Sequence, residues 1–167
     1  AGGGLIVGSL GGAGTLLSGL IGDRLGARNV GNYMLLPAWA FLIAVPAGAA
    51  VFLVDDLWLV LVLYTLPVFL VNLYTGPTFG MTQSLAPLAM RAAASALLLF
   101  IINIIGLVFG PTTVGIVSDL LQSSWQISDV ESLRYALLGC NFVYLLSFMF
   151  YFLASRTLES DLAQGAK

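Results

Sequence analysis

The sequence predicts an all-α polytopic membrane protein, and three observations lead to this fold class. Five long apolar runs divide the 167 residues, 59% of the residues are hydrophobic, and only 8% are charged. The mean hydropathy is +1.01, whereas soluble domains carry roughly 25% charged residues. A soluble fold could not bury this much apolar surface, so we expect the runs to be helices that cross a lipid bilayer.

Charged residues alternate in sign along the connections between the runs. Basic residues lie in the first and third connections and near the C-terminus: Arg24, Arg28, Arg91, Arg156 and Lys167. Acidic residues dominate the second and fourth connections: Asp55, Asp56, Asp119, Asp129 and Glu131. Arg134 is the exception. Because arginine-bearing connections stay in the cytoplasm, the pattern predicts five crossings with a cytoplasmic C-terminus.

The composition disfavours several functions. A net charge of −2 provides no basic face for phosphates, so we expect no nucleic-acid partner. The single cysteine, Cys140, lies inside an apolar run and the chain has no histidine, so we expect neither a metal site nor a cofactor. An intramembrane enzyme needs a nucleophile with a base, a metal cluster or paired acids at membrane depth. No apolar run offers such a set, so the sequence predicts a protein that is not an enzyme.

The first two predicted helices contain many residues that a soluble helix would avoid. The run 4–22 is rich in glycine and serine, and Gly8 and Gly12 give it a face that another helix can approach closely. A flexible linker is the alternative, which the small number of polar residues disfavours. The run 33–54 contains two prolines. Membrane helices tolerate proline because neighbours satisfy the freed carbonyls, so we expect a kinked outer helix.

The remaining three runs complete the predicted bundle. The runs 57–80, 92–117 and 135–154 each reach the roughly 20 residues that a helical crossing requires. Aromatic residues in the last run fit an interfacial belt at its ends and lipid contact between them. We therefore expect residues 1–155 to form a partial transmembrane bundle and residues 156–167 to form a cytoplasmic tail.

Polar side chains deep in two runs are candidates for a substrate cavity. Asn103 lies about 16 Å from the cytoplasmic end of its run, which is close to the bilayer midplane. Asn72 precedes Thr75 by three residues, so the two share a helix face. A polar amide at this depth needs a partner. Asn72, Thr75 and Asn103 are predicted to line a cavity, with hydrogen bonding between helices as the alternative.

A compact charge cluster follows the first run. It combines an acid, two arginines and turn glycines: Gly19, Asp23, Arg24, Gly26 and Arg28. Spacing alone leaves a solvated turn as the alternative. The stretch resembles the G-x-x-x-D-R-x-G-x-R signature of the major facilitator superfamily, with Ala27 in place of the usual basic residue. The resemblance implies a conformational-switch motif. Its position after the first crossing implies helices eight to twelve of a twelve-helix carrier, which are most of the C-terminal six-helix bundle.

The fourth run carries a second motif. Small residues and a proline follow Asn103 at helical spacing: Gly106, Gly110, Pro111 and Gly115. They resemble the G-x-x-x-G-P segment in the fifth and eleventh helices of the same superfamily. The resemblance implies a helix that bends as a gate, and an ordinary packing face is the alternative.

Within the superfamily, the pattern from Asn72 to Asp119 resembles bacterial members of the Spinster-like group. That resemblance implies secondary transport of a small organic or amphipathic lipid-like solute by alternating access in the bacterial inner membrane. The implied partners are the lipid bilayer, the solute and the missing N-terminal helices of the same transporter. The last three runs contain no Asp, Glu, Lys, Arg or His, so a carboxylate for proton coupling is expected in the missing portion. A non-transporting scaffold or accessory subunit is the alternative function.

Overall fold

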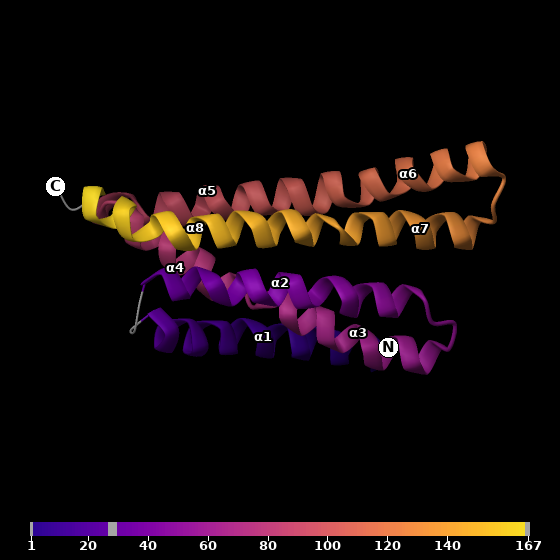
Figure 1. The fold of residues 1–167 in the computed structure, drawn as a ribbon, viewed down its shortest axis with the longest axis horizontal. Helices are drawn as coiled ribbons and strands as arrows, with labels where there is room; N and C mark the ends of the chain where they lie inside the picture. The colour runs from indigo at the N-terminus through magenta and orange to yellow at the C-terminus, as the bar shows by residue number, and fades with distance from the viewer. Residues whose placement is uncertain (1, 27–29, 166–167) are drawn as a thin grey trace.

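The computed structural model describes residues 2–26 and 30–165, with side chains at residues 4, 8, 9, 11–26 and 31–158. Every regular element in these ranges is a helix (Figure 1). The elements are α1 (Gly2–Gly26), α2 (Val30–Phe52), α3 (Leu57–Asn72), α4 (Thr75–Leu85), the 3₁₀ turn η1 (Leu88–Met90), α5 (Arg91–Asn103), the π-helical segment η2 (Ile104–Phe109), α6 (Gly110–Trp125), α7 (Asp129–Asn141) and α8 (Val143–Gly165). The all-α fold class predicted from the sequence is confirmed.

The helices have the lengths that membrane crossings require. Within the part of the chain whose side chains are described, four helical stretches are long and apolar enough to cross a membrane: Gly31–Phe52, Leu57–Leu85, Leu88–Trp125 and Asp129–Leu158. α1 contains 25 residues, and at about 1.5 Å per residue it also exceeds the roughly 30 Å of a bilayer core. The connection between α6 and α7 contains only residues 126–128, because both helices continue past the apolar runs.

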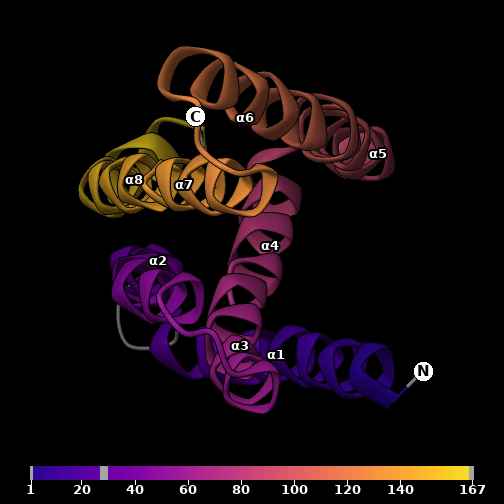
Figure 2. The ribbon, with the colours of Figure 1, turned by 90° about the vertical axis from the view of Figure 1, so that its right-hand side faces the viewer.

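The helices form two layers that α4 connects. α1, α2 and α3 lie in one layer, whereas α5, α6, α7 and α8 lie in the other (Figure 1). α4 leans from the first layer toward α5, with which it packs (Figure 2). The most extensive packing between the layers joins α2 to α8, and α2 also contacts α7. α1 packs on α2, α3 and α4.

The buried core is small and lies where α2, α4 and α8 meet. Three buried side chains form its centre and three partly buried ones pack against them: Tyr33, Met34, Leu158, Met81, Tyr151 and Ala154. Phe41 of α2 stacks on Tyr151 of α8, with ring centroids 5.6 Å apart. By contrast, the apolar stretch formed by α5, η2 and α6 has none of its most apolar window buried. Its side chains are therefore available to lipid or to further helices.

Two of the long stretches are interrupted beside a proline. α3 and α4 are separated by a turn at residues 73–74, and Pro77 has no N–H to donate to the carbonyl four residues before it. η2 ends directly before the pair Gly110 and Pro111, and the Gly110 N–H donates to the carbonyl of Ile105, five residues back. A proline ring clashes with the carbonyl four residues earlier, and a π-helical turn relieves this clash.

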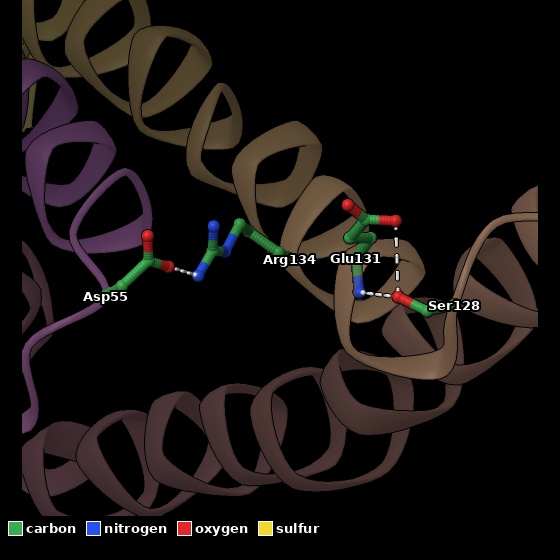
Figure 3. A network of polar contacts seen from close by, with 4 residues as sticks. All are labelled: Asp55, Ser128, Glu131 and Arg134. Atoms are coloured by element: carbon green, nitrogen blue, oxygen red, sulfur yellow. Dashed lines mark hydrogen bonds and ion pairs between the residues drawn. The ribbon is translucent and has the colours of Figure 1, made fainter.

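The end of the molecule opposite the C-terminus carries an ion pair. The α2–α3 and α6–α7 connections lie at this end (Figure 1). Arg134 of α7 pairs there with Asp55 of the α2–α3 connection (Figure 3). The Ser128 hydroxyl accepts the N–H of Glu131 and donates to its carboxylate, which caps the start of α7. The one basic residue that breaks the charge alternation is therefore paired with an acid at the same end.

Candidate functional site

The charge motif lies at the end of α1, beside the first turns of α2. Asp23 and Arg24 are exposed there. Arg28 of the same predicted motif lies outside the described residues. Gly26 has a steric role, because a Cβ at this position would lie 2.9 Å from the Tyr33 ring. The motif glycine therefore makes room for an aromatic side chain of the next helix.

Tyr33 is a buried wedge between α1 and α4, with only 8% of its surface exposed. Its ring fills the space beside Gly22 of α1, where a Cβ would lie 2.9 Å from the ring. Its hydroxyl lies against Gly80 of α4, where a Cβ would lie 2.5 Å from the oxygen. The hydroxyl also lies 3.4 Å from the Gly76 carbonyl oxygen.

Ser18 connects α1 to the break in the third crossing. The side chain is completely buried. Its Oγ accepts the N–H of Gly76 at 2.9 Å and donates to the Thr15 carbonyl at 2.6 Å. A Cβ on Gly76 would lie 2.7 Å from this oxygen and 2.8 Å from the Gly19 nitrogen, so a side chain does not fit. Ser18 and Tyr33 are not among the residues predicted from the sequence, because neither helix alone reveals that α1 and α2 meet α4.

The predicted cavity residues at the break are bonded within their own segment. The Asn72 amide donates to the Val68 carbonyl at 2.8 Å, and the Thr75 hydroxyl donates to the Asn72 carbonyl at 2.9 Å. The Asn72 side chain also faces α1, since a Cβ on Gly11 would lie 3.4 Å from its Nδ2. In this structure the two residues stabilise the break and its contact with α1.

The third predicted cavity residue and the predicted gate lie on another helix. Asn103 ends α5, is exposed, and donates to the Leu99 carbonyl at 2.7 Å. Pro111 is also exposed. Three glycines beside them would meet no described heavy atom within 4 Å of an added Cβ: Gly106, Gly110 and Gly115. Gly106 and Gly110 line a cavity between the π-helical segment and the other helices.

Two cavities lie between the helices. One, of about 460 Å³, lies among α1, α2 and α3 and is lined mainly by aliphatic side chains and Trp39. The other, of about 600 Å³, lies between η2 and α6 on one side and α2, α3, α7 and α8 on the other. Its lining includes Tyr64, Thr113 and the buried Asn141. Neither cavity is lined by any of the three predicted cavity residues. No group of three potential metal ligands occurs among the described residues.

A known bacterial protein resembles this chain over almost its whole length. The chain is 30% identical over 164 residues to an MFS-type efflux pump of Mycolicibacterium smegmatis. The match covers 98% of this chain and 38% of the relative, so the chain spans less than two-fifths of the relative's length. No family model matches the chain.

The chain shares its fold with part of a solved bacterial transporter. A bacterial homologue of the human lysosomal transporter Spinster, in its inward-facing and unoccupied conformation, matches with a TM-score of 0.80 and 22% identity over 93% of this chain and 39% of that chain. The inward-facing and occupied conformation gives a TM-score of 0.75, also at 22% identity, and covers 40% of that chain. The resemblance to the major facilitator superfamily predicted from the sequence is confirmed, and the chain is an integral membrane protein.

Proposed function

We propose that this chain forms helices eight to twelve of a secondary active transporter, most of its C-terminal six-helix bundle. The observation that carries this proposal is the match of 93% of the chain to an inward-facing transporter structure at a TM-score of 0.80. The 98% coverage by a relative described as an efflux pump also supports a transport role. The proposed location is the bacterial inner membrane, with the C-terminus in the cytoplasm.

The proposed mechanism is alternating access, in which two bundles rock about a central site. In this mechanism Asp23, Arg24 and Arg28 bridge the cytoplasmic ends of the two bundles and stabilise the outward-facing state. η2 supplies a flexible point between α5 and α6, since π-helical turns and prolines are where membrane helices bend. The gate would therefore bend at Pro111.

The remaining helices of the same protein are the proposed partner of two uncovered faces. Glycines on α1 and α6 meet no described atom within 4 Å of an added Cβ and line neither of the two cavities: Gly8, Gly12, Gly19 and Gly115. Small-residue faces allow membrane helices to approach closely. Both faces are therefore suited to contacts with helices of the missing portion.

The proposed substrate is a small organic or amphipathic lipid-like solute. Asn103 is the candidate that supports direct contact, because its amide is exposed on an apolar helix. An amide at membrane depth gains free energy from any polar partner, whether a helix or a solute. In this proposal Asn72 and Thr75 affect the cavity indirectly, because their hydrogen bonds hold the backbone at the break between α3 and α4.

Transport by the full-length protein in liposomes tests the proposal. Ethidium and a fluorescent lysophosphatidylcholine serve as probes for an organic cation and an amphipathic lipid, with an imposed proton or sodium gradient. We expect at least one probe to move severalfold faster than in protein-free liposomes. Asp23→Asn should slow this movement while leaving membrane insertion intact. Movement of neither probe would contradict the proposal and favour the accessory subunit, and unchanged transport by Asp23→Asn would contradict the role of the motif.

A further inference from the structure

The cavity among α1, α2 and α3 is apolar along its length and polar at one end. Its volume is about 460 Å³, within the range of about 300–1,000 Å³ that is usual for ligand pockets. Every described lining residue is leucine, isoleucine, alanine or tryptophan, except Asn32 in the first turn of α2. This lining suits a hydrocarbon chain that ends in a polar group.

The cavity spans about the thickness of one bilayer leaflet. On α2 its lining runs from Asn32 to Ile43, which is about 16 Å at 1.5 Å per residue. Half of a bilayer core is about 15 Å. Its lining also includes Leu25 in the last turn of α1 and Leu70 in the last turn of α3. All three helices therefore place the cavity in the same half of the bilayer, beside the α1–α2 end of the molecule.

The cavity has a floor of protein and an open side. Ala40 and Leu73 are buried, whereas Trp39 and Ile43 leave 52% and 50% of their surfaces exposed. The glycine faces proposed for contact with the missing helices do not line this cavity. A chain from the surrounding bilayer can therefore enter from the side, along the exposed face of α2.

The polar end of the cavity coincides with a basic end of the molecule. The Asn32 side chain makes no hydrogen bond to any described residue, so its amide is available to donate to a phosphate oxygen. Leu25, which lines the cavity at this end, directly follows the exposed Arg24. The sequence 23–29 contains two arginines and one aspartate, so its net charge is +1. An anionic headgroup is therefore favoured at this end over a zwitterionic one.

We infer that this cavity is a binding site for one anionic phospholipid from the leaflet at the arginine-bearing end. One acyl chain lies along α2 from Asn32 to Ile43, against Trp39, and the phosphate lies between the Asn32 amide and the Arg24 guanidinium. This lipid is resident in the site and is not the transported solute, because the cavity opens sideways to lipid and spans a single leaflet. Apart from the position of the missing helices, the inference does not rest on the proposed function.

Quenching of Trp39 fluorescence by a brominated lipid tests the site. The probe is phosphatidylglycerol brominated in the middle of its acyl chains, titrated at low salt into the full-length protein in detergent micelles. Each protein is measured with and without Trp39→Phe, and the difference isolates the fluorescence of Trp39 from that of all other tryptophans. We expect this difference signal to be quenched with a saturable midpoint, because the chain lies against the indole ring.

Two variants test the two ends of the site. Asn32→Ala removes the amide, so the quenching midpoint should rise about two- to tenfold, the range expected for one net hydrogen bond. Asn103→Ala is the matched control, because that amide lines neither cavity. Leu36→Phe adds volume inside the cavity and should raise the midpoint severalfold, whereas Leu97→Phe, on the exposed face of α5, should leave it unchanged. The thermal midpoint of each variant reports that it is folded.

Brominated phosphatidylcholine tests the headgroup. Its midpoint should be about fivefold higher than that of phosphatidylglycerol, because a zwitterionic headgroup loses the net attraction to an arginine at the membrane surface. Equal midpoints for the two lipids would overturn the inference of an anionic lipid. Equal midpoints for Asn32→Ala and Asn103→Ala would overturn the position of the headgroup.

The absence of saturable Trp39 quenching by either lipid would overturn the site itself and show that detergent or another helix occupies the cavity. Transport and quenching are measured separately. Failure of the transport probes to move would therefore leave the lipid site standing. Conversely, transport without saturable quenching would retain the transporter and remove the lipid site.

Discussion

Single glycines determine how closely the helices of this protein approach one another. A Cβ on Gly14 of α1 would lie 2.8 Å from the Phe69 carbonyl oxygen of α3. A Cβ on Gly48 of α2 would lie 2.5 Å from the Oδ1 of Asn141 on α7. Since a membrane bundle gains stability from packing rather than from expulsion of water, these contacts matter more here than a helix-propensity scale would indicate. Glycine at such positions is a packing residue.

Gly76→Ala should destabilise the protein. The added methyl would meet the Gly19 backbone nitrogen at 2.8 Å as well as the Ser18 hydroxyl, and a backbone atom cannot rotate away. We expect a cost of about 1–3 kcal/mol, typical of an overpacked site, seen as a lower thermal midpoint of the full-length protein in detergent. Gly139→Ala is the control, because its Cβ meets no described atom within 4 Å. Equal midpoints for the two variants would contradict the proposed contact.

Asn103 and Asn72 should respond differently to alanine. Asn103 is exposed and bonds only to its own helix among the described residues, so Asn103→Ala should change stability by less than about 0.5 kcal/mol and slow transport severalfold. Asn72 lies against α1, so Asn72→Ala should cost roughly 1 kcal/mol of stability. Thermal midpoints and probe transport in liposomes separate the two effects. Wild-type transport by Asn103→Ala would remove it from the substrate site.

At the scale of helices, the sequence predicts which segments are helical, but it is less informative about where a helix is interrupted. Apolar length predicts the helices, because lipid leaves no other way to satisfy the backbone. Gly76 and Pro77 also mark a place where the helix can open, and the turn at residues 73–74 lies directly before them. The break at Phe142, between α7 and α8, has no proline near it, and Gly139, whose carbonyl accepts the Phe142 N–H, resembles the other glycines that lie inside unbroken helices. Its position depends on packing that only the assembled helices define.

The sequence of a single helix also does not show which of its faces contacts another helix. The predicted close-packing face of the first run contains Gly8 and Gly12, yet neither meets a described atom within 4 Å of an added Cβ. Gly11 and Gly14 face α3 instead. All four residues are alike in sequence, because small residues recur at helical spacing on both faces. The same ambiguity explains why Ser18 and Tyr33 escaped prediction while Asp23 and Arg24 matched a recognisable motif.

Pro111→Ala should straighten the fourth crossing. Restoring the N–H allows the carbonyl four residues earlier to accept an ordinary helical hydrogen bond. The clash with the proline ring, which produces the π-helical segment, is then removed. We expect a thermal midpoint at least as high as in the unchanged protein and slower transport, because the proposed gate bends less readily. Pro46→Ala is the control for proline removal, since Pro46 is also exposed inside a helix. Similar transport losses in both variants would contradict a specific gate at Pro111.

At the scale of the whole molecule, charge is sorted between the two ends. The last turn of α1 and the α4–α5 connection lie at the same end as the last turns of α8, and the α2–α3 and α6–α7 connections lie at the other (Figure 1). Arg134 fits this arrangement because it pairs with Asp55 (Figure 3). Arg24, in the last turn of α1, and Arg91, the first residue of α5, lie at the first of these ends. The positive-inside rule therefore predicts that this end lies in the cytoplasm.

Cysteine labelling on intact cells checks this orientation. In a Cys140→Ser background, Ser84→Cys at the end of α4 and Ser123→Cys near the end of α6 give one exposed thiol each. Both serines bond within their own helices, so the two substitutions should be equally mild. A membrane-impermeant maleimide should label Ser123→Cys on intact cells and Ser84→Cys only after permeabilisation. The reverse pattern would place Asp23 and Arg24 outside the cytoplasm. The charge motif could then not bridge the cytoplasmic ends of the two bundles, as the proposed mechanism requires.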